Sequence, residues 1–213
     1  DRAEPALAAR VQSLAAALRA QPLQGLIDLV PAYASLALHF DPLRVDASKV
    51  ADWLRAAQRR LQDTTQPADT PRRVEIPVCY GGDYGPDLSE VANQLGLTEA
   101  EVIARHSGGD YIVAMLGFLP GFPYLLGLDP SLAVPRLATP RAEVKAGSVG
   151  IGGAQTGIYP QSSPGGWRLI GRTPERLFDA RRTPPSLLQP GDRVRFVAID
   201  PGEFKMLQRE LQR

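Results

Sequence analysis

The sequence predicts an α+β protein, with a small N-terminal α/β domain over residues 1–72 and a β-barrel domain over residues 73–213. The first domain is indicated by two helical patterns with a strand-like segment between them. The second is indicated by short apolar segments separated by glycine and proline turns, without repeating helices. A chain of 213 residues is long enough for one large or two small domains, and either can bury a core.

Three elements are expected in the first domain. Apolar residues at helical spacing predict a helix over residues 4–21, and strict alternation predicts a half-buried strand over residues 33–40. A second helix is expected over residues 48–61, and the polar, proline-containing segment 62–72 is expected to be the domain linker. One or more further strands of this domain would precede residue 1.

The second domain begins with a short strand at residues 73–78 and continues with two short helices. Asp87 with Glu90 begins the first helix, and Thr98 with Glu101 forms a capping box for the second. The strand-like segments that follow predict a closed or nearly closed barrel, and they read YIVAMLGF, VKAGSVGIG, GIYP, WRLIGR and RVRFVAI. The last helix is expected over residues 202–211.

The glycine-rich stretch 108–171 is the most informative segment for function. It holds 13 of the 20 glycines and is also rich in proline and aromatic residues, which indicates shaped loops rather than a flexible linker. Between residues 130 and 172, Glu143 is the single acidic residue against five cations: Arg136, Arg141, Lys145, Arg168 and Arg172. Arginines near backbone N–H groups suit carboxylates and phosphates. The alternative is that these arginines are solvated or paired with acids from elsewhere in the chain.

Composition argues against several classes of function. A formal net charge of +1 without a run of Lys or Arg does not favour nucleic acid as the main partner. Two histidines do not favour a histidine-built metal site, and no apolar run reaches the roughly 18 residues that span a bilayer. The single cysteine excludes an intramolecular disulfide. With no visible signal peptide, we expect a cytoplasmic protein that does not bind membranes.

Familiar catalytic motifs fail in this chain. The three lysines all lie outside a phosphate-binding loop, and the dinucleotide fingerprint that begins at Gly150 has Gln155 where its last glycine should be. Residues 146–150 resemble a nucleophile elbow, but no helical pattern follows Ser148. A serine in a turn, or one that binds a ligand through its hydroxyl, is therefore favoured over a nucleophile.

The polar residues of the glycine-rich stretch are the candidates for a site. His106 is the one good candidate for titration near pH 7, unless it only complements the dipole of a helix end. Lys145 could bind a phosphate or carboxylate, and Gln155 could orient an amide or a ring carbonyl. Trp167, Phe118 and Phe122 are expected in the core rather than in a ligand platform.

Several motifs, in order along residues 30–200, resemble the KipI/PxpB family, also labelled allophanate hydrolase subunit 1. They read CYGGDYGPDLSEVA, LTEAEVIARHSGGDYIVAMLGFLPGFPYLLGLD, AGSVGIGG, QTGIYP and SPGGWRLIGRTP. The resemblance implies that the second domain is a cyclophilin-like β-barrel. The chain departs from the family pattern at Lys145, where proline is common, and at Gly153, where alanine is common.

The resemblance also implies a function. It points to a subunit of a bacterial ATP-dependent 5-oxoprolinase, which opens 5-oxoproline to glutamate and is inactive without its other subunits. The implied partners are a PxpC-type (subunit 2) protein and a LamB/YcsF-type protein, and the implied cofactor is ATP, with Mg²⁺ left open. Two alternatives remain: a KipI-like inhibitor of a histidine kinase, and a subunit of a urea carboxylase or allophanate hydrolase-type carboxyltransferase.

The matched motifs and the local chemistry give a set of site residues. The residues assigned to catalysis are His106, Arg172 and Lys145. The residues assigned to substrate or nucleotide binding are Arg141, Gly147, Ser148, Gln155, Thr156, Tyr159, Gly165, Gly166 and Arg168. No metal ligand is assigned. Three acids in the second half of this chain could hold Mg²⁺, namely Asp110, Asp129 and Glu143, and a partner could supply further ligands.

Overall fold

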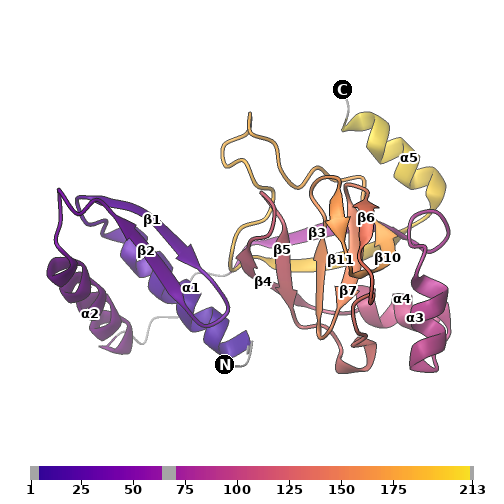
Figure 1. The fold of residues 1–213 in the computed structure, drawn as a ribbon, viewed down its shortest axis with the longest axis horizontal. Helices are drawn as coiled ribbons and strands as arrows, with labels where there is room; N and C mark the ends of the chain where they lie inside the picture. Colours follow the sequence, from indigo (N-terminus) through magenta and orange to yellow (C-terminus); the bar gives the residue numbers. More distant parts are fainter. Residues whose placement is uncertain (1–4, 64–70, 212–213) are drawn as a thin grey trace. The chain divides into compact units, whose positions relative to one another are not determined.

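A computed structural model describes residues 5–63 and 71–211 (Figure 1). The chain divides into two compact units, Asp1–Pro71 and Arg72–Arg213. The division falls one residue before the boundary expected from the sequence. The expected linker lies largely outside the described residues, as does the first residue of the expected N-terminal helix.

The first unit consists of two helices and a two-stranded antiparallel sheet, in the order α1 (Pro5–Ala20), β1 (Leu26–Pro31), β2 (Leu36–Phe40) and α2 (Ala47–Asp63). Leu18, Leu29 and Ala57 form its buried core. Both helices confirm the predicted ones. The predicted strand begins three residues too early, because residues 32–35 form the turn between β1 and β2, closed by a 2.9 Å hydrogen bond from Ala32 N to Ser35 O.

The second unit contains a closed seven-stranded barrel, in the order β10-β3-β11-β4-β5-β8-β7. Neighbouring strands are antiparallel except β3 and β11, which run parallel. The barrel strands are β3 (Arg73–Tyr80), β4 (Tyr111–Leu116), β5 (Pro123–Leu126), β7 (Ser148–Gly152), β8 (Gln155–Ile158), β10 (Arg168–Arg172) and β11 (Arg193–Ile199). The closed barrel confirms the predicted architecture of this domain.

The remaining elements of the second unit lie outside the barrel, with its helices on one side in this view (Figure 1). A separate two-stranded sheet pairs β6 (Arg141–Val144) with β9 (Ser163–Gly165). Three helices and one 3₁₀ turn complete the unit: α3 (Leu88–Leu95), α4 (Glu99–Ser107), η1 (Pro130–Leu132) and α5 (Pro201–Glu210). Leu88 and Val91 of α3 and Val102 of α4 join the buried core, together with fully buried strand residues such as Ile76 and Ile151.

The starts of the two short helices differ. The capping box of α4 is confirmed, since Thr98 Oγ1 accepts from Glu101 N at 3.2 Å and the Glu101 carboxylate accepts from Thr98 N at 2.8 Å. Asp87 precedes α3, but its side chain makes no capping hydrogen bond. The prediction that Asp87 starts this helix is confirmed, although its carboxylate accepts from Arg141 and Leu169 rather than from the helix N–H groups.

Candidate functional site

The glycines of β7 and β8 form a flat surface on which Trp167 lies. A Cβ atom added at Gly152 would be 2.7 Å from the indole ring, and one added at Gly157 would be 3.0 Å from it. Trp167 is 5% exposed, and its ring centroid lies 5.6 Å from that of Phe122 in an edge-to-face contact. Trp167 and Phe122 are thus in a core, as predicted. The same prediction for Phe118 is wrong, because its ring is 60% exposed on the loop before β5. Close approach of a side chain, rather than of a ligand, explains these two glycines.

Asp87 and Arg141 form a buried ion pair that the sequence did not reveal. Asp87 Oδ1 lies 2.5 Å from Arg141 Nη2, and Oδ2 accepts a hydrogen bond from Leu169 N at 2.6 Å. The carboxylate side chain is 5% exposed and the arginine side chain is 30% exposed. Arg141 Nη1 is also buried, and it has no hydrogen-bond partner among the described residues. The pair therefore presents a fixed guanidinium whose Nη1 amino group has no partner in the described part of the chain.

Arg168 repeats this arrangement with an acid of α3. Its Nη1 lies 2.6 Å from Glu90 Oε1, while its buried Nε has no partner in the described part of the chain. Ser163 Oγ, on β9, is buried and unpartnered in the same sense. For these two arginines, the structure shows the alternative in which they pair with acids from elsewhere in the chain. Their unused N–H groups also leave the anion-binding interpretation open, so the two interpretations are compatible.

Tyr159 completes this group. It is 2% exposed, and a Cβ atom added at Gly165 would lie 2.5 Å from its hydroxyl, so only glycine fits there. Burial raises the pKa of the Tyr159 hydroxyl, although the Trp167 backbone N–H and the charges of Arg136 and Arg141 act in the opposite direction. The hydroxyl is therefore protonated at neutral pH. We call Asp87, Arg141, Tyr159, Ser163 and Arg168 the arginine site.

Gly147 and Arg172 hold the turn before β7 against β10. Arg172 Nε donates to Ala146 O at 2.8 Å, and Gly147 bonds to Tyr159 O through its N–H and to Thr173 N through its carbonyl, at 2.7 and 2.9 Å. At φ +81°, an added Cβ at Gly147 would lie 2.3 Å from Thr173 O, so glycine is required. Ser148 is 4% exposed inside β7, with no helix after it, which agrees with rejecting a nucleophile elbow.

His106 lies in the barrel core rather than in a site open to substrate. It has no exposed surface, its Nδ1 is 2.8 Å from Tyr80 Oη, and its Nε2 is 2.9 Å from Thr156 Oγ1. Because the Thr156 hydroxyl donates to Gly150 O, its oxygen accepts the Nε2 proton, and Tyr80 donates to Nδ1. Burial lowers the His106 pKa to about 3. The prediction that His106 titrates near pH 7 is therefore wrong, and a neutral imidazole cannot complement the helix dipole either.

The other predicted site residues lie in different surroundings. Gln155 is half-buried at the start of β8, and Lys145 is exposed beyond β6. Gly166 O accepts from Leu137 N at 2.7 Å, which ties the segment before β6 to the one after β9. The structure thus brings together three of the predicted residues, Arg141, Tyr159 and Gly165. Arg168 adjoins Leu169, whose N–H bonds Asp87, and its own side chain pairs with Glu90. Asp87 was missed as a partner, although it lies inside the matched motif CYGGDYGPDLSEVA.

The acids considered for Mg²⁺ are used elsewhere. Asp110 lies 2.8 Å from Arg193, Asp129 accepts from Ser131 N at 2.9 Å, and Glu143 accepts from Ser162 Oγ at 2.8 Å. Within residues 5–63 and 71–211, no cluster of three or more His, Cys, Asp or Glu side chains could hold a metal ion. None of the described helices is long and apolar enough to cross a membrane.

The barrel, its α/β companion and the matched sequence pattern define the class of this chain. The family model of the carboxyltransferase domain, subdomain C and D, matches residues 1–188. The chain belongs to this family. Within it, the chain is 45% identical to a 5-oxoprolinase subunit of Bacillus subtilis (strain 168), over 94% of this chain and 87% of that protein. It is 52% identical to the corresponding 5-oxoprolinase subunit of Escherichia coli O157:H7, over 73% of this chain and 71% of that protein. These relatives confirm the resemblance to the KipI/PxpB family.

Solved structures agree with this assignment. TTHA0988 superposes with a TM-score of 0.82 at 42% identity, over 94% of this chain but only 38% of that chain. The conserved uncharacterized protein PH0987 from Pyrococcus horikoshii gives a TM-score of 0.62 at 47% identity, over 96% of this chain and 93% of that chain. The K. lactis urea amidolyase is 20% identical with a TM-score of 0.75, over 97% of this chain and 14% of that chain, and it shares the fold.

Proposed function

We propose that this chain is a subunit of an ATP-dependent 5-oxoprolinase complex that opens 5-oxoproline to glutamate, and that it is inactive alone. The observation that carries the proposal is its 45% identity, over 94% of its length, to a protein named as a 5-oxoprolinase subunit. The arginine site supports the proposal because it offers buried N–H donors that have no partner among the described residues.

The chemistry of lactam opening explains why such donors are needed. An unactivated lactam becomes easier to open once its carbonyl oxygen carries a phosphoryl group, which ATP would supply. Stabilising that transfer requires fixed cations for phosphate oxygens and donors for the developing charge. Arg141 Nη1 and Arg168 Nε would bind anionic oxygens, and Ser163 Oγ would donate a further hydrogen bond. These residues fit an anionic group, whereas no metal cluster was found among the described residues.

Four further side chains have supporting roles in this proposal. Asp87 positions Arg141, because its carboxylate is held from the other side by Leu169 N. Tyr159, with its raised pKa, would act as a hydrogen-bond donor rather than as a base. Arg172 holds the turn before β7, so it would act on the site's shape. Lys145 is exposed and would reach a ligand only from the surface.

A complex with other proteins is part of the proposal. The implied partners are a PxpC-type protein and a LamB/YcsF-type protein in the cytoplasm. This chain spans 38% of TTHA0988, and the polypeptide of TTHA0988 therefore carries further sequence. A partner's residues would then complete the arginine site, including any ligands for Mg²⁺.

A second candidate function is carboxyl transfer involving urea. It is favoured by the family description and by 26% identity to a putative urea carboxylase of Emericella nidulans, over 65% of this chain and 13% of that protein. The identity to the 5-oxoprolinase subunit of Bacillus subtilis is much higher and covers most of that protein. We therefore favour the proposal with 5-oxoproline as substrate over the one with urea.

The test is ATP hydrolysis by this chain co-purified with its PxpC-type and LamB/YcsF-type neighbours, with and without 5-oxoproline. Turnover that requires 5-oxoproline and releases glutamate would support the proposal, and the same assay on the chain alone tests whether it is inactive. A stable complex without such turnover would favour the urea-type function. Failure to form any complex would favour binding to a histidine kinase.

A further inference from the structure

The loop 117–121 displays an aromatic ring that the core does not explain. Phe118 is 60% exposed, and its φ of 65° makes it the one non-glycine residue with positive φ in the described ranges. A bulky side chain is strained in this region of backbone space. The ring meets two others edge-on, with centroids 5.4 Å from Phe122 and 6.3 Å from Tyr159. A strained backbone that holds an apolar ring in solvent points to a contact made outside this chain.

A surface pocket of about 390 Å³, wide open to solvent, lies beside this ring. It is lined by residues 116–121 together with Phe178 and Ser186, and most of this lining is apolar. The two loops touch, since an added Cβ at Gly121 would lie 2.9 Å from Phe178 Cβ. Residues 111–128 contain no charged residue at all. The pocket therefore suits a large apolar side chain.

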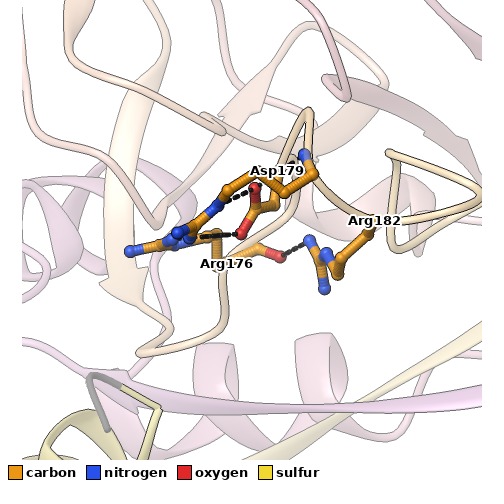
Figure 2. A network of polar contacts seen from close by, with 4 residues as sticks. Arg176, Asp179 and Arg182 are labelled. Carbon is orange, nitrogen blue, oxygen red and sulfur yellow. Dashed lines mark hydrogen bonds and ion pairs between the residues drawn. The ribbon is translucent and has the colours of Figure 1, made fainter.

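The second loop adds positive charge next to the pocket. Figure 2 shows Arg176 and Arg182 near Asp179, whose carboxylate accepts from Arg176 at 3.2 Å and from Arg181 at 3.0 and 3.1 Å. Arg182 donates instead to the backbone oxygen of Arg176 at 2.6 Å. The Asp179 side chain is 15% exposed, whereas those of Arg176 and Arg181 are 52% and 81% exposed. Two guanidinium groups thus share one largely covered carboxylate, a third lies beside them, and the loop is cationic on its outer side. We call the 117–121 and 176–182 loops together the Phe118 surface.

We propose that the Phe118 surface docks an acidic segment of the PxpC-type protein, with one large apolar side chain in the pocket and carboxylates over Arg176 and Arg181. The identity of the partner rests on the proposed function. Aromatic and arginine side chains are enriched where protein interfaces are strongest, and opposite charges guide such docking. A second copy of this chain would bring the same cationic loop against itself, which disfavours self-association through this surface.

The experiment uses biolayer interferometry at several salt concentrations to measure the affinity of the full chain for the purified PxpC-type protein. Phe118→Asn removes the ring while Asn tolerates positive φ, and Arg181→Glu reverses the most exposed charge. The controls are Leu43→Asn, at a residue 95% exposed in the first unit, and Arg195→Glu, whose side chain is 70% exposed on β11. Circular dichroism establishes that each variant is folded.

We expect Phe118→Asn to weaken the Kd about tenfold or more, as for a central interface residue. Arg181→Glu should slow association and reduce its dependence on salt, while both controls bind as wild type. Three results would each overturn the proposal. They are wild-type affinity of both surface variants, no binding of the wild type at any salt concentration, and dimerisation of this chain that Phe118→Asn abolishes. Glutamate release by the assembled complex is measured in parallel. Weakened binding without any 5-oxoproline turnover by wild type would overturn the function but keep the surface.

Discussion

The buried pair of Asp87 and Arg141 gives the most direct test of the arginine site. Asp87→Ala removes two hydrogen bonds, leaves Leu169 N buried without a partner and leaves Arg141 without its carboxylate. An unsatisfied buried donor costs about 1–3 kcal/mol. Loss of one partner from a fully buried ion pair costs about 3–5 kcal/mol, and this figure must be reduced here because the Arg141 side chain is 30% exposed. We expect the free energy of unfolding to fall by about 2–4 kcal/mol.

The assay is urea denaturation in a double-mutant cycle that combines Asp87→Asn with Arg141→Gln. Asn keeps an oxygen for Leu169 N, so the cycle isolates the interaction between the carboxylate and the guanidinium. A coupling energy of about 1–3 kcal/mol is expected for groups in direct buried contact. The matched control is the pair of Asp52 and Arg55, whose side chains are 75% and 62% exposed and should couple by under about 0.5 kcal/mol. If the buried pair couples no more strongly than this control, the claim that Asp87 fixes Arg141 is refuted.

Three further predictions follow from the same contacts. Gly152→Ala should lower the free energy of unfolding by about 1–3 kcal/mol in urea denaturation, because the new Cβ would lie 2.7 Å from Trp167. In the control Gly166→Ala, the nearest atom to the new Cβ is 3.6 Å away, and stability should change little. Equal effects of the two substitutions would contradict the packing argument. Because the His106 pKa is lowered to about 3, the unfolded chain binds a proton between about pH 6.5 and pH 3 that the folded chain does not bind. As the pH falls through this range, the free energy of unfolding of the wild type should decrease by up to about 1.4 kcal/mol per pH unit more than that of His106→Gln. Parallel profiles of the two proteins would show that His106 does not titrate as inferred. In the assembled complex, Arg141→Lys should lower kcat about 10²-fold through loss of the Nη1 donor, while Arg195→Lys should not, and full activity of Arg141→Lys would remove Arg141 from the site.

Local sequence signals predicted much of the fold but few of its contacts. The helix now found at Ala47–Asp63 was predicted from apolar spacing, and the capping box of α4 from residues three apart. Strand β1 was missed because its sequence LIDLVP ends in proline and shows no strict alternation of apolar and polar residues. The Asp87–Arg141 pair joins residues 54 positions apart, and no local period encodes such a contact.

His106 shows why residue type alone could not place the site. A histidine near a helix end is a reasonable candidate for titration, and its motif match pointed the same way. The decisive facts are tertiary: α4 turns the imidazole toward Phe196, with the ring centroids 4.5 Å apart, and Thr156 and Tyr80 satisfy both ring nitrogens. Each of these partners comes from a different strand, so none could be recognised from the sequence around His106.

The cationic bias of the glycine-rich stretch now has a physical explanation. Acids at the start of α3 hold Arg141 and Arg168, so the pairs contribute order to the fold. A guanidinium has five N–H donors, however, and within residues 5–63 and 71–211 each arginine keeps one buried nitrogen without a partner. Because a buried donor without a partner is costly, a fold that needed only the ion pairs would gain by covering those donors with acceptors. These donors are the reason for proposing an anionic ligand at Arg141 and Arg168, which Asp87 and Glu90 already fix in position.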